Sequence, residues 1–388
     1  MDYDCDVLVV GAGPAGVAAA RSAALGGANT ILIEKKDEIG NFIQCGEGFS
    51  NYLMGKLPFK IPKKFISREI RGLRFSLDDF FVELSGDYWG GLSINKKGFL
   101  EHITKEAKEA GTKVLTGHEL VSIKDGNTSH PVAVIRHYKD EFSLKPKVII
   151  GADGVNSSVF ENIFPQNKKT VAYVVCREYV GISLDAPEFD YMYFNEETPY
   201  DYPFLFPIDN KRALIGVVSV SSRENALRSF DIFLQSNKIK NLILSASAFV
   251  DRSGGVTLTQ NKKIMENNIL LVGDSANHNI KPFFEGNLPG IIAGNIAGEV
   301  ASEFILGSGE LTEYITRLNE SLGEELEYSK EMANLMLKIN MLQDSKKAAL
   351  LNFGLFSNLI GSKELKNSLK LEIEEVRDVL NQKLINLN

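Results

Sequence analysis

A glycine-rich turn near the start of the sequence constrains the fold more than any other feature. An apolar run ends at Gly11, an alanine-rich segment follows, and a second apolar run is closed by Glu34. Gly11 permits a tight turn, Gly13 lets the backbone approach a pyrophosphate, and Gly16 lets the helix pack on the strand. The N-terminus of such a helix presents unpaired N–H groups to phosphates. Residues 7–34 therefore predict a strand–turn–helix–strand unit that binds a dinucleotide.

Glu34 narrows the identity of that dinucleotide. The residue lies where a carboxylate can accept hydrogen bonds from an adenosine ribose. A negative charge here disfavours a 2′-phosphate, so the pattern favours FAD or NAD over NADP. A GxGxxG pattern alone is weak, but here the flanking strand, helix and acid agree with it. The residues of this unit that we expect to bind the cofactor are Gly11, Gly13, Ala15, Gly16 and Glu34.

Composition excludes several classes of protein. The 388 residues carry a net charge of -7, which argues against nucleic-acid binding because phosphates call for an excess of Lys and Arg. Three widely spaced cysteines form neither a disulfide framework nor a metal-ligand pattern, so we expect a reducing cytoplasm. No secretory signal is expected, because the acidic N-terminus runs directly into the first strand. The apolar run at 288–306 is interrupted by polar and acidic residues, so we expect a buried helix there.

Two later turns share the character of the first one. Residues 151–154 and 273–274 combine glycine with aspartate, and each turn follows an apolar run that suits a buried parallel strand. In doubly wound sheets, ligands bind beyond the carboxyl ends of the strands. We therefore expect the three turns to converge on one cofactor at one edge of a sheet.

Several longer motifs carry a resemblance to a known family. They are QCGEGFS (44–50), NKKGFLEHITKEAKEAGTKV, GADGVNSSV, YPFLFP (202–207), GDSAN and PFFEGNL. Their order resembles the para-hydroxybenzoate-hydroxylase-like FAD proteins and, among these, the geranylgeranyl reductase family, typified by archaeal digeranylgeranylglycerophospholipid reductases. The resemblance implies FAD as the cofactor, with Asp274 binding its ribityl and ribose hydroxyls. The alternative is that Asp274 caps the next helix.

The pattern along the chain predicts an α/β fold. It combines a Rossmann-like FAD-binding domain, an inserted substrate domain with a mixed or antiparallel sheet, and a helical C-terminal tail. Residues 171–220 are rich in Tyr, Phe and Val with alternating polarity, which suits a sheet with one packed face. The expected FAD-binding domain comprises 1–56, 92–157 and 264–306. The expected substrate domain comprises 57–91 and 158–263, and residues 307–388 form the C-terminal helical region.

Further cofactor contacts are implied by the resemblance. The corresponding positions are Cys45, Gly46, Gly48, Lys96, Leu120, Gly286, Asn287 and Leu288. Two of the three glycines in the family's P-x-x-G-G-G-I segment are absent, although Asn287 is a good helix N-cap. Glu285 would oppose an anionic reduced flavin unless it points to solvent. Lys96 stands where the family usually has an arginine. A lysine presents a single ammonium charge, whereas the guanidinium of an arginine can donate two parallel hydrogen bonds.

The chemistry implied by the resemblance is saturation of isolated double bonds in the prenyl chains of isoprenoid membrane-lipid precursors. A hydride from the flavin must be matched by a proton at the other carbon, so the site must be dry, apolar and able to donate a proton. Cys45 and Glu47 are the expected catalytic residues. Cys45 could instead be a small buried hydrophobe. Glu47 could instead cap a helix or pair with Lys96 or Arg71.

Tyr202, Phe204 and Phe206 are the expected substrate-binding residues. Their alternate positions would place three rings on one face of a strand, as the wall of a lipid site. Ordinary sheet packing is the alternative. Pro203 and Pro207 argue against a central position for this strand, because proline cannot donate to the ladder.

The expected partners are a prenyl lipid and an electron donor. The single dinucleotide fingerprint is filled by FAD, so we expect a reduced ferredoxin-like carrier rather than a nicotinamide. Apolar residues at 350–360, flanked by lysines, are typical of a peripheral contact with the inner membrane surface, with a packed core as the alternative. Two other functions stay open at this point. They are an FAD-dependent aromatic monooxygenase and a flavin- or lipid-binding protein without catalysis.

Overall fold

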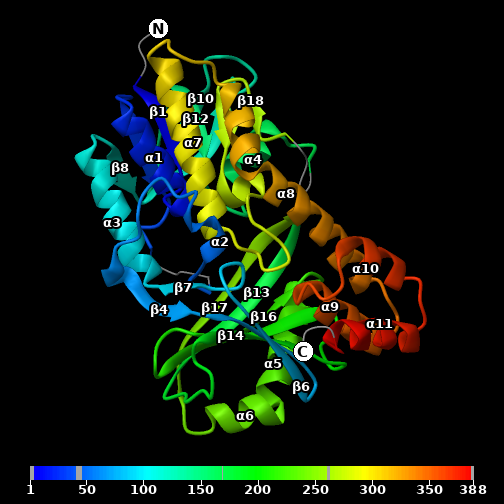
Figure 1. Ribbon diagram of the computed structural model, residues 1–388. Helices are drawn as coiled ribbons and strands as arrows, with labels where there is room; N and C mark the ends of the chain where they lie inside the picture. Colours follow the sequence, from blue (N-terminus) through cyan, green and yellow to red (C-terminus); the bar gives the residue numbers. More distant parts are fainter. Residues whose placement is uncertain (1–3, 41–45, 168, 260–262, 386–388) are drawn as a thin grey trace.

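The computed structural model describes residues 4–40, 46–167, 169–259 and 263–385. The chain forms a six-stranded sheet, a seven-stranded sheet and a group of C-terminal helices. These helices lie beside the larger sheet (Figure 1). The predicted α/β fold, with a second sheet and a helical C-terminal region, is confirmed.

The six-stranded sheet contains the glycine-rich unit. Its strands are β1 (Cys5–Val10), β2 (Thr30–Glu34), β8 (Lys113–Thr116), β12 (Pro146–Gly151), β18 (Met265–Glu266) and β19 (Ile269–Leu271). The order is β18–β19–β12–β1–β2–β8, and all neighbours except β18 and β19 are parallel. Since β1, β12 and β19 are neighbours, the turns after them meet at one edge of the sheet.

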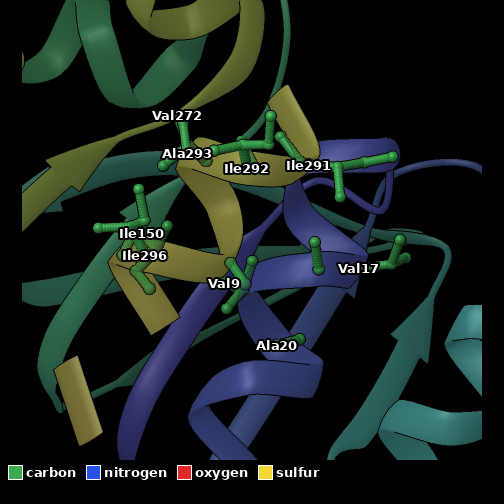
Figure 2. Packing of buried hydrophobic residues seen from close by; sticks show 14 of the residues in the cluster. Val9, Val17, Ala20, Ile150, Val272, Ile291, Ile292, Ala293 and Ile296 are labelled. Atoms are coloured by element: carbon green, nitrogen blue, oxygen red, sulfur yellow. The ribbon is translucent and has the colours of Figure 1, made fainter. Parts of the chain in front are cut away.

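Two helices pack closely against each other over this sheet, α1 (Pro14–Leu25) and α7 (Asn287–Ile305). A Cβ atom on Gly294 would lie 2.1 Å from the carbonyl oxygen of Ala15, so glycine allows this approach. Figure 2 shows the apolar residues of both helices against Val9 and Ile150. The buried helix predicted at 288–306 is confirmed as α7. Within the described ranges, no helix is long and apolar enough to cross a membrane.

The seven-stranded sheet has the order β17–β13–β16–β15–β14–β5–β6. Its strands are β5 (Gly72–Leu77), β6 (Phe80–Ser85), β13 (Thr170–Val180), β14 (Phe189–Phe194), β15 (Asp201–Pro207), β16 (Arg212–Ser219) and β17 (Ser247–Thr259). Every neighbouring pair is antiparallel except β14 and β5, which are parallel. One face packs against α5 (Arg223–Gln235) and α6 (Asn237–Ile243), and the other faces the C-terminal helices.

The expected peripheral position of the YPFLFP segment is wrong. Strand β15 lies inside the sheet, between β16 and β14. It pairs with β16 from Asp201 to Pro207 but with β14 only at Phe204 and Leu205. The ladder with β14 therefore avoids the two prolines, which is how a central strand tolerates Pro203 and Pro207.

Four helices form the C-terminal region: α8 (Glu313–Asn340), α9 (Ser345–Phe356), α10 (Ser362–Ser368) and α11 (Ile373–Ile385). The apolar residues at 350–360 do not form the expected membrane-facing surface. Leu351 and Phe353 have no exposed surface, and Phe356 is 2% exposed. They belong to the core that joins these helices to the seven-stranded sheet. The apolar pattern of α9 therefore arises from packing, as the alternative interpretation held.

The remaining described elements are two three-stranded sheets, three helices and two 3-10 turns. One three-stranded sheet consists of β3 (Gly48–Ser50), β7 (Gly91–Ile94) and β4 (Ile66–Ile70), and the other of β9 (His118–Lys124), β10 (Val132–His137) and β11 (Asp140–Leu144). The helices are α2 (Asn51–Met54), α3 (Lys96–Glu109) and α4 (Ser158–Ile163), with 3-10 turns η1 (Lys63–Phe65) and η2 (Gly273–Ala276). The short strand β3 begins two residues after Gly46, and a Cβ on Gly46 would lie 2.7 Å from the ring of Phe206 in β15.

Candidate active site

The turn after β1 is tightly packed except where a ligand is expected. Gly11 has a φ of +99°, and a Cβ there would lie 2.5 Å from the carbonyl oxygen of Ala152 in the second turn. A Cβ on Gly16 would lie 1.8 Å from the carbonyl oxygen of Gly11. A Cβ on Gly13 would meet no atom within 4 Å. The glycines therefore close the turn on itself and leave its middle open, as a pyrophosphate requires.

Glu34 is held against this turn. One carboxylate oxygen accepts a hydrogen bond from the backbone N–H of Ala12 at 2.8 Å. The other accepts a hydrogen bond from the backbone N–H of Lys36 at 3.0 Å. Glu34 is half-buried, so a carboxylate with remaining acceptor capacity stands beside the turn.

A cavity of about 230 Å³ lies at the edge where the three turns meet. Residues from all three turns line it, together with the loop at Gly46 and the start of α3 and α7; they include Gly13, Ala15, Gly46, Lys96, Ala152, Gly154, Gly273, Asp274, Gly286 and Asn287. The predicted convergence of the turns is therefore confirmed. The open Gly13, the helix N-terminus and the ribose-side carboxylate together fit FAD.

Asp274 lines this cavity from the third turn. Its carboxylate accepts a hydrogen bond at 2.9 Å from the side-chain amide of Asn279. Burial raises the pKa of Asp274 above its ordinary value. The carboxylate does not bind the first N–H groups of α7, because Glu285 does so. The position of Asp274 therefore suits the implied contact with the hydroxyls of FAD.

The N-cap residue of helix α7 is Gly286, and the side chain of the preceding Glu285 binds the first N–H groups of the helix. One oxygen of Glu285 accepts hydrogen bonds from the backbone N–H groups of Asn287 at 2.9 Å and of Leu288 at 3.2 Å. The other accepts one from the backbone N–H of Ser50 at 3.2 Å. The expectation that Asn287 is the N-cap is wrong, because α7 begins at Asn287 and its side chain donates to the carbonyl of Gly48. Glu285 is turned to these donors and not to solvent.

A second cavity, of about 570 Å³, adjoins the first. Its volume lies within the range of small-molecule sites. The two cavities share five lining residues, Gly46, Phe206, Phe283, Phe284 and Asn287. The rest of the wall is largely apolar and includes Phe49, Leu73, Trp89, Leu92 and Met192. The larger cavity therefore lies next to the expected cofactor position, and its wall suits an apolar ligand.

Three aromatic rings of β15 stand at the junction of the cavities. Tyr202, Phe204 and Phe206 lie on the same face of the strand and line the smaller cavity. The rings of Phe204 and Phe206 are stacked, with centroids 4.4 Å apart. Phe206 also lines the larger cavity, and a Cβ on Gly46 would lie 2.7 Å from its ring. Of the three rings, only Phe206 lines both cavities and approaches Gly46, and the substrate-binding role of all three stays a prediction.

Both expected catalytic residues, Cys45 and Glu47, belong to the segment around Gly46. Only Glu47 lies in the described part of the chain. Cys45 lies outside the described residues. Glu47 has a φ of +59°, and its carboxylate lies 3.8 Å from the guanidinium of Arg252. Arg252 also pairs at 2.7 Å with the buried Glu178. Arg71, one of the two alternative partners, has its guanidinium over the ring of Phe189.

Burial raises the pKa of the Glu47 carboxyl, and the nearby cation of Arg252 opposes that rise. Glu47 is not among the described residues that line either cavity, whereas its neighbours Gly46 and Gly48 are. The carboxylate is therefore directed to Arg252, which ties the loop to β17.

Sequence reasoning missed a carboxyl group on the wall of the larger cavity. Asp190 of β14 lines it, and Asp190 keeps accessible surface because it faces this space. Burial raises the pKa of Asp190 to about 8. The alternation along β14 was the available signal, because Asp190 shares a face with the buried Met192.

Two expected contacts involve residues whose side chains lie in the core. Leu120 of β9 packs beside the six-stranded sheet, and Leu288 of α7 packs in the core between this helix and the sheet. Any contact with FAD would therefore use their backbones. The backbone N–H of Leu288 already donates to Glu285. The roles of both residues stay predictions.

Comparison with known proteins places the chain in a family. The model of the FAD dependent oxidoreductase family matches residues 6–154. A digeranylgeranylglycerophospholipid reductase of Methanocaldococcus jannaschii is 30% identical over 308 residues, covering 77% of this chain and 77% of that protein. The corresponding reductase of Methanococcus aeolicus is 27% identical, covering 89% and 91%.

Solved structures agree on the fold. A geranylgeranyl bacteriochlorophyll reductase-like protein of Thermoplasma acidophilum matches with a TM-score of 0.76 and 23% identity, covering 98% of this chain and 99% of that chain. A flavin-dependent brominase matches with a TM-score of 0.71 and 16% identity, covering 94% and 98%. The motifs, the three converging turns and the curated relatives agree: the chain belongs to the digeranylgeranylglycerophospholipid reductase family of FAD-dependent oxidoreductases.

Proposed function

We propose that the protein saturates isolated double bonds in prenyl chains of isoprenoid membrane-lipid precursors, with FAD as its cofactor. The observation that carries this proposal is the adjoining pair of cavities. The smaller one gathers the FAD-binding turns, and the larger one is apolar and shares Phe206 and Phe284 with it. The names of the curated relatives support the same substrate class.

An isolated alkene is unpolarised, so reduction requires an electron pair at one carbon and a proton at the other. FAD, when bound and reduced, supplies the electron pair as a hydride. The chain's own part is to exclude water and hold the alkene beside the cofactor. The faces of Phe204 and Phe206 are electron-rich and suit positive charge that develops on the more substituted carbon.

The two alternatives have weaker support. A monooxygenase shares this fold, but fold likeness alone does not assign an activity. Loss of catalysis was suggested by Glu285 and Asn287 in the altered glycine segment. Glu285 is bonded by the N-terminus of α7 and by Ser50, so its negative charge is compensated by donors. These hydrogen bonds to Glu285 weaken the alternative of a flavin-binding protein without catalysis.

We also propose a reduced ferredoxin-like carrier as the electron donor. This follows from the single dinucleotide fingerprint, which FAD occupies. A peripheral contact with the membrane surface stays a proposal. It would have to use a surface other than residues 350–360, which are packed in the core.

Photoreduction of the bound FAD under anaerobic conditions tests the function. Addition of a digeranylgeranylglycerophospholipid should then reoxidise the flavin without oxygen. Reoxidation that depends on oxygen and an aromatic substrate, with consumption of NADPH, would favour the monooxygenase. Retention of reduced flavin under both conditions would favour the binding protein.

A further inference from the structure

Asp190 lines the larger cavity close to its junction with the smaller one. Parallel pairing of β14 with β5 sets Asp190 beside Leu73, and both residues line the 570 Å³ cavity. Antiparallel pairing sets Tyr191 opposite Leu205 and Met192 opposite Phe204. If this register is continued by one residue in each strand, Asp190 stands opposite Phe206, and both side chains lie on the same face of the sheet. Phe206 lies at the junction with the smaller cavity.

Asp190 also differs from Glu47 and Glu285 in that no described residue is bonded to its carboxyl group. Among the described residues, none donates a hydrogen bond to its carboxyl or pairs with it as a cation, and burial is the sole cause that raises its pKa to about 8. Glu285 is engaged by the N-terminus of α7, and Glu47 is directed to Arg252. At neutral pH the Asp190 carboxyl is therefore largely protonated and able to donate.

We propose that Asp190 is the catalytic acid that donates the proton to the prenyl double bond in the larger cavity. This inference rests on the proposed function. The O–H bond of Asp190 breaks as a C–H bond forms at one alkene carbon. The hydride from reduced FAD forms the C–H bond at the other carbon and leaves FAD oxidised by two electrons. The Asp190 carboxylate then regains a proton from water, so atoms and charge balance.

Other titratable groups face the same cavity and bear on its pH dependence. They are Lys281, Glu285, Glu324, Glu325 and three tyrosines, Tyr52, Tyr88 and Tyr328. The pKa values of all three tyrosines are raised, so these side chains stay neutral through pH 8. Burial lowers the pKa of Lys281 to about 7, and its ammonium donates to Asn277 and Asn279. A change of the reaction rate near pH 8 can therefore be assigned to Asp190 only by comparison with a variant that lacks its carboxyl group.

The test uses FAD-loaded protein, photoreduced without oxygen and mixed with a digeranylgeranylglycerophospholipid. For Asp190→Asn, which is nearly isosteric, the rate of flavin reoxidation should fall about 100-fold or more, the contribution of a general acid. FAD content and lipid affinity should stay at the parental level, and Asp190→Glu should restore part of the rate. The parental rate should fall as the pH rises above about 8, and this decline should be absent in Asp190→Asn.

Asp209→Asn is the matched control. Asp209 lies in the turn after β15, bonded to Arg212, and is not among the described residues lining either cavity. Its variant should keep the parental rate and pH profile. If Asp190→Asn reduces the lipid at the parental rate with the same alkaline decline, the inference is overturned. If the parental protein reduces no prenyl lipid, the proposed function fails and the inference falls with it.

Discussion

The carboxylate of Glu285 accepts a hydrogen bond at 2.9 Å from the backbone N–H of Asn287 at the start of helix α7. The same side chain reaches back to the backbone N–H of Ser50, just after the glycine loop. One buried carboxylate thus joins two segments that are 235 residues apart in sequence. Both segments line the junction of the two cavities.

Glu285→Ala should destabilise the protein and loosen FAD. Three backbone donors would lose their acceptor, and loss of a capping side chain costs about 0.5–2 kcal/mol. Urea unfolding of the apoprotein and FAD release from the holoprotein measure the two effects. Asp344→Ala is the control, because Asp344 caps α9 far from the turns. It should lower stability without changing FAD release; equal FAD release in both variants would argue against the role of Glu285 at the site.

Glu34→Ala should weaken FAD binding about ten-fold or more. The change removes a charged acceptor, worth about 1.5–3 kcal/mol, next to the turn that receives the pyrophosphate. Fluorescence of released flavin during dialysis measures the loss. The exposed Glu38 supplies the control Glu38→Ala, which should retain FAD as the parent does. Unchanged retention in Glu34→Ala would mean that the ribose is held elsewhere.

Cys45→Ser should slow the reoxidation of reduced FAD by a prenyl lipid while leaving FAD content nearly unchanged. A loss of about 1.4 kcal/mol in barrier stabilisation corresponds to about ten-fold in rate. Cys176→Ser is the comparison, since Cys176 lies on β13 and is 2% exposed. Burial of a hydroxyl there should cost about 1–3 kcal/mol of stability and leave the rate intact. Parental rates in both variants would exclude a catalytic part for Cys45.

Asp190→Asn should change stability in a pH-dependent way. The folded pKa of Asp190 is raised to about 8 from an ordinary value of 3.8, so the folded state holds a proton that the unfolded state releases. Stability of the parent therefore falls as pH rises between about 4 and 8, because protonation favours the folded state. The stability of Asp190→Asn relative to the parent should grow over that window and level off above it. Urea unfolding at pH 4, 6 and 8 would show no such trend if Asp190 were ionised in the folded protein.

The sequence predicted those parts of the site that depend on local or strictly repeated patterns. Gly11, Gly13 and Glu34 lie within one continuous unit, and parallel strands must present their turns at the same edge. The relation of Asp190 to Phe206 depends on how distant strands pair. The alternation along β14 groups Asp190 with Met192 on one face, but it does not show that this face meets a cavity.

Long-range contacts explain features of the site that the sequence did not indicate. Asn287 is a good cap by residue type, but Gly286 is the N-cap, and the side chain of Glu285 binds both the first N–H groups of α7 and the backbone N–H of the distant Ser50. Glu47 pairs with Arg252 because β17 passes beside the loop, over a separation of some two hundred residues that spacing cannot reveal. The domain boundaries stay a prediction. Strands β4 and β7 pair with each other although they lie on opposite sides of the boundary expected near residue 91.

Mass spectrometry of the lipid after one anaerobic turnover tests the central claim most directly. FAD-loaded protein is photoreduced, mixed with a digeranylgeranylglycerophospholipid and quenched once the flavin is oxidised. The account predicts that the lipid gains the mass of two hydrogen atoms for each flavin oxidised, with the new hydrogens on a prenyl double bond. An unchanged lipid, or a lipid that gains oxygen only when air is admitted, would contradict it.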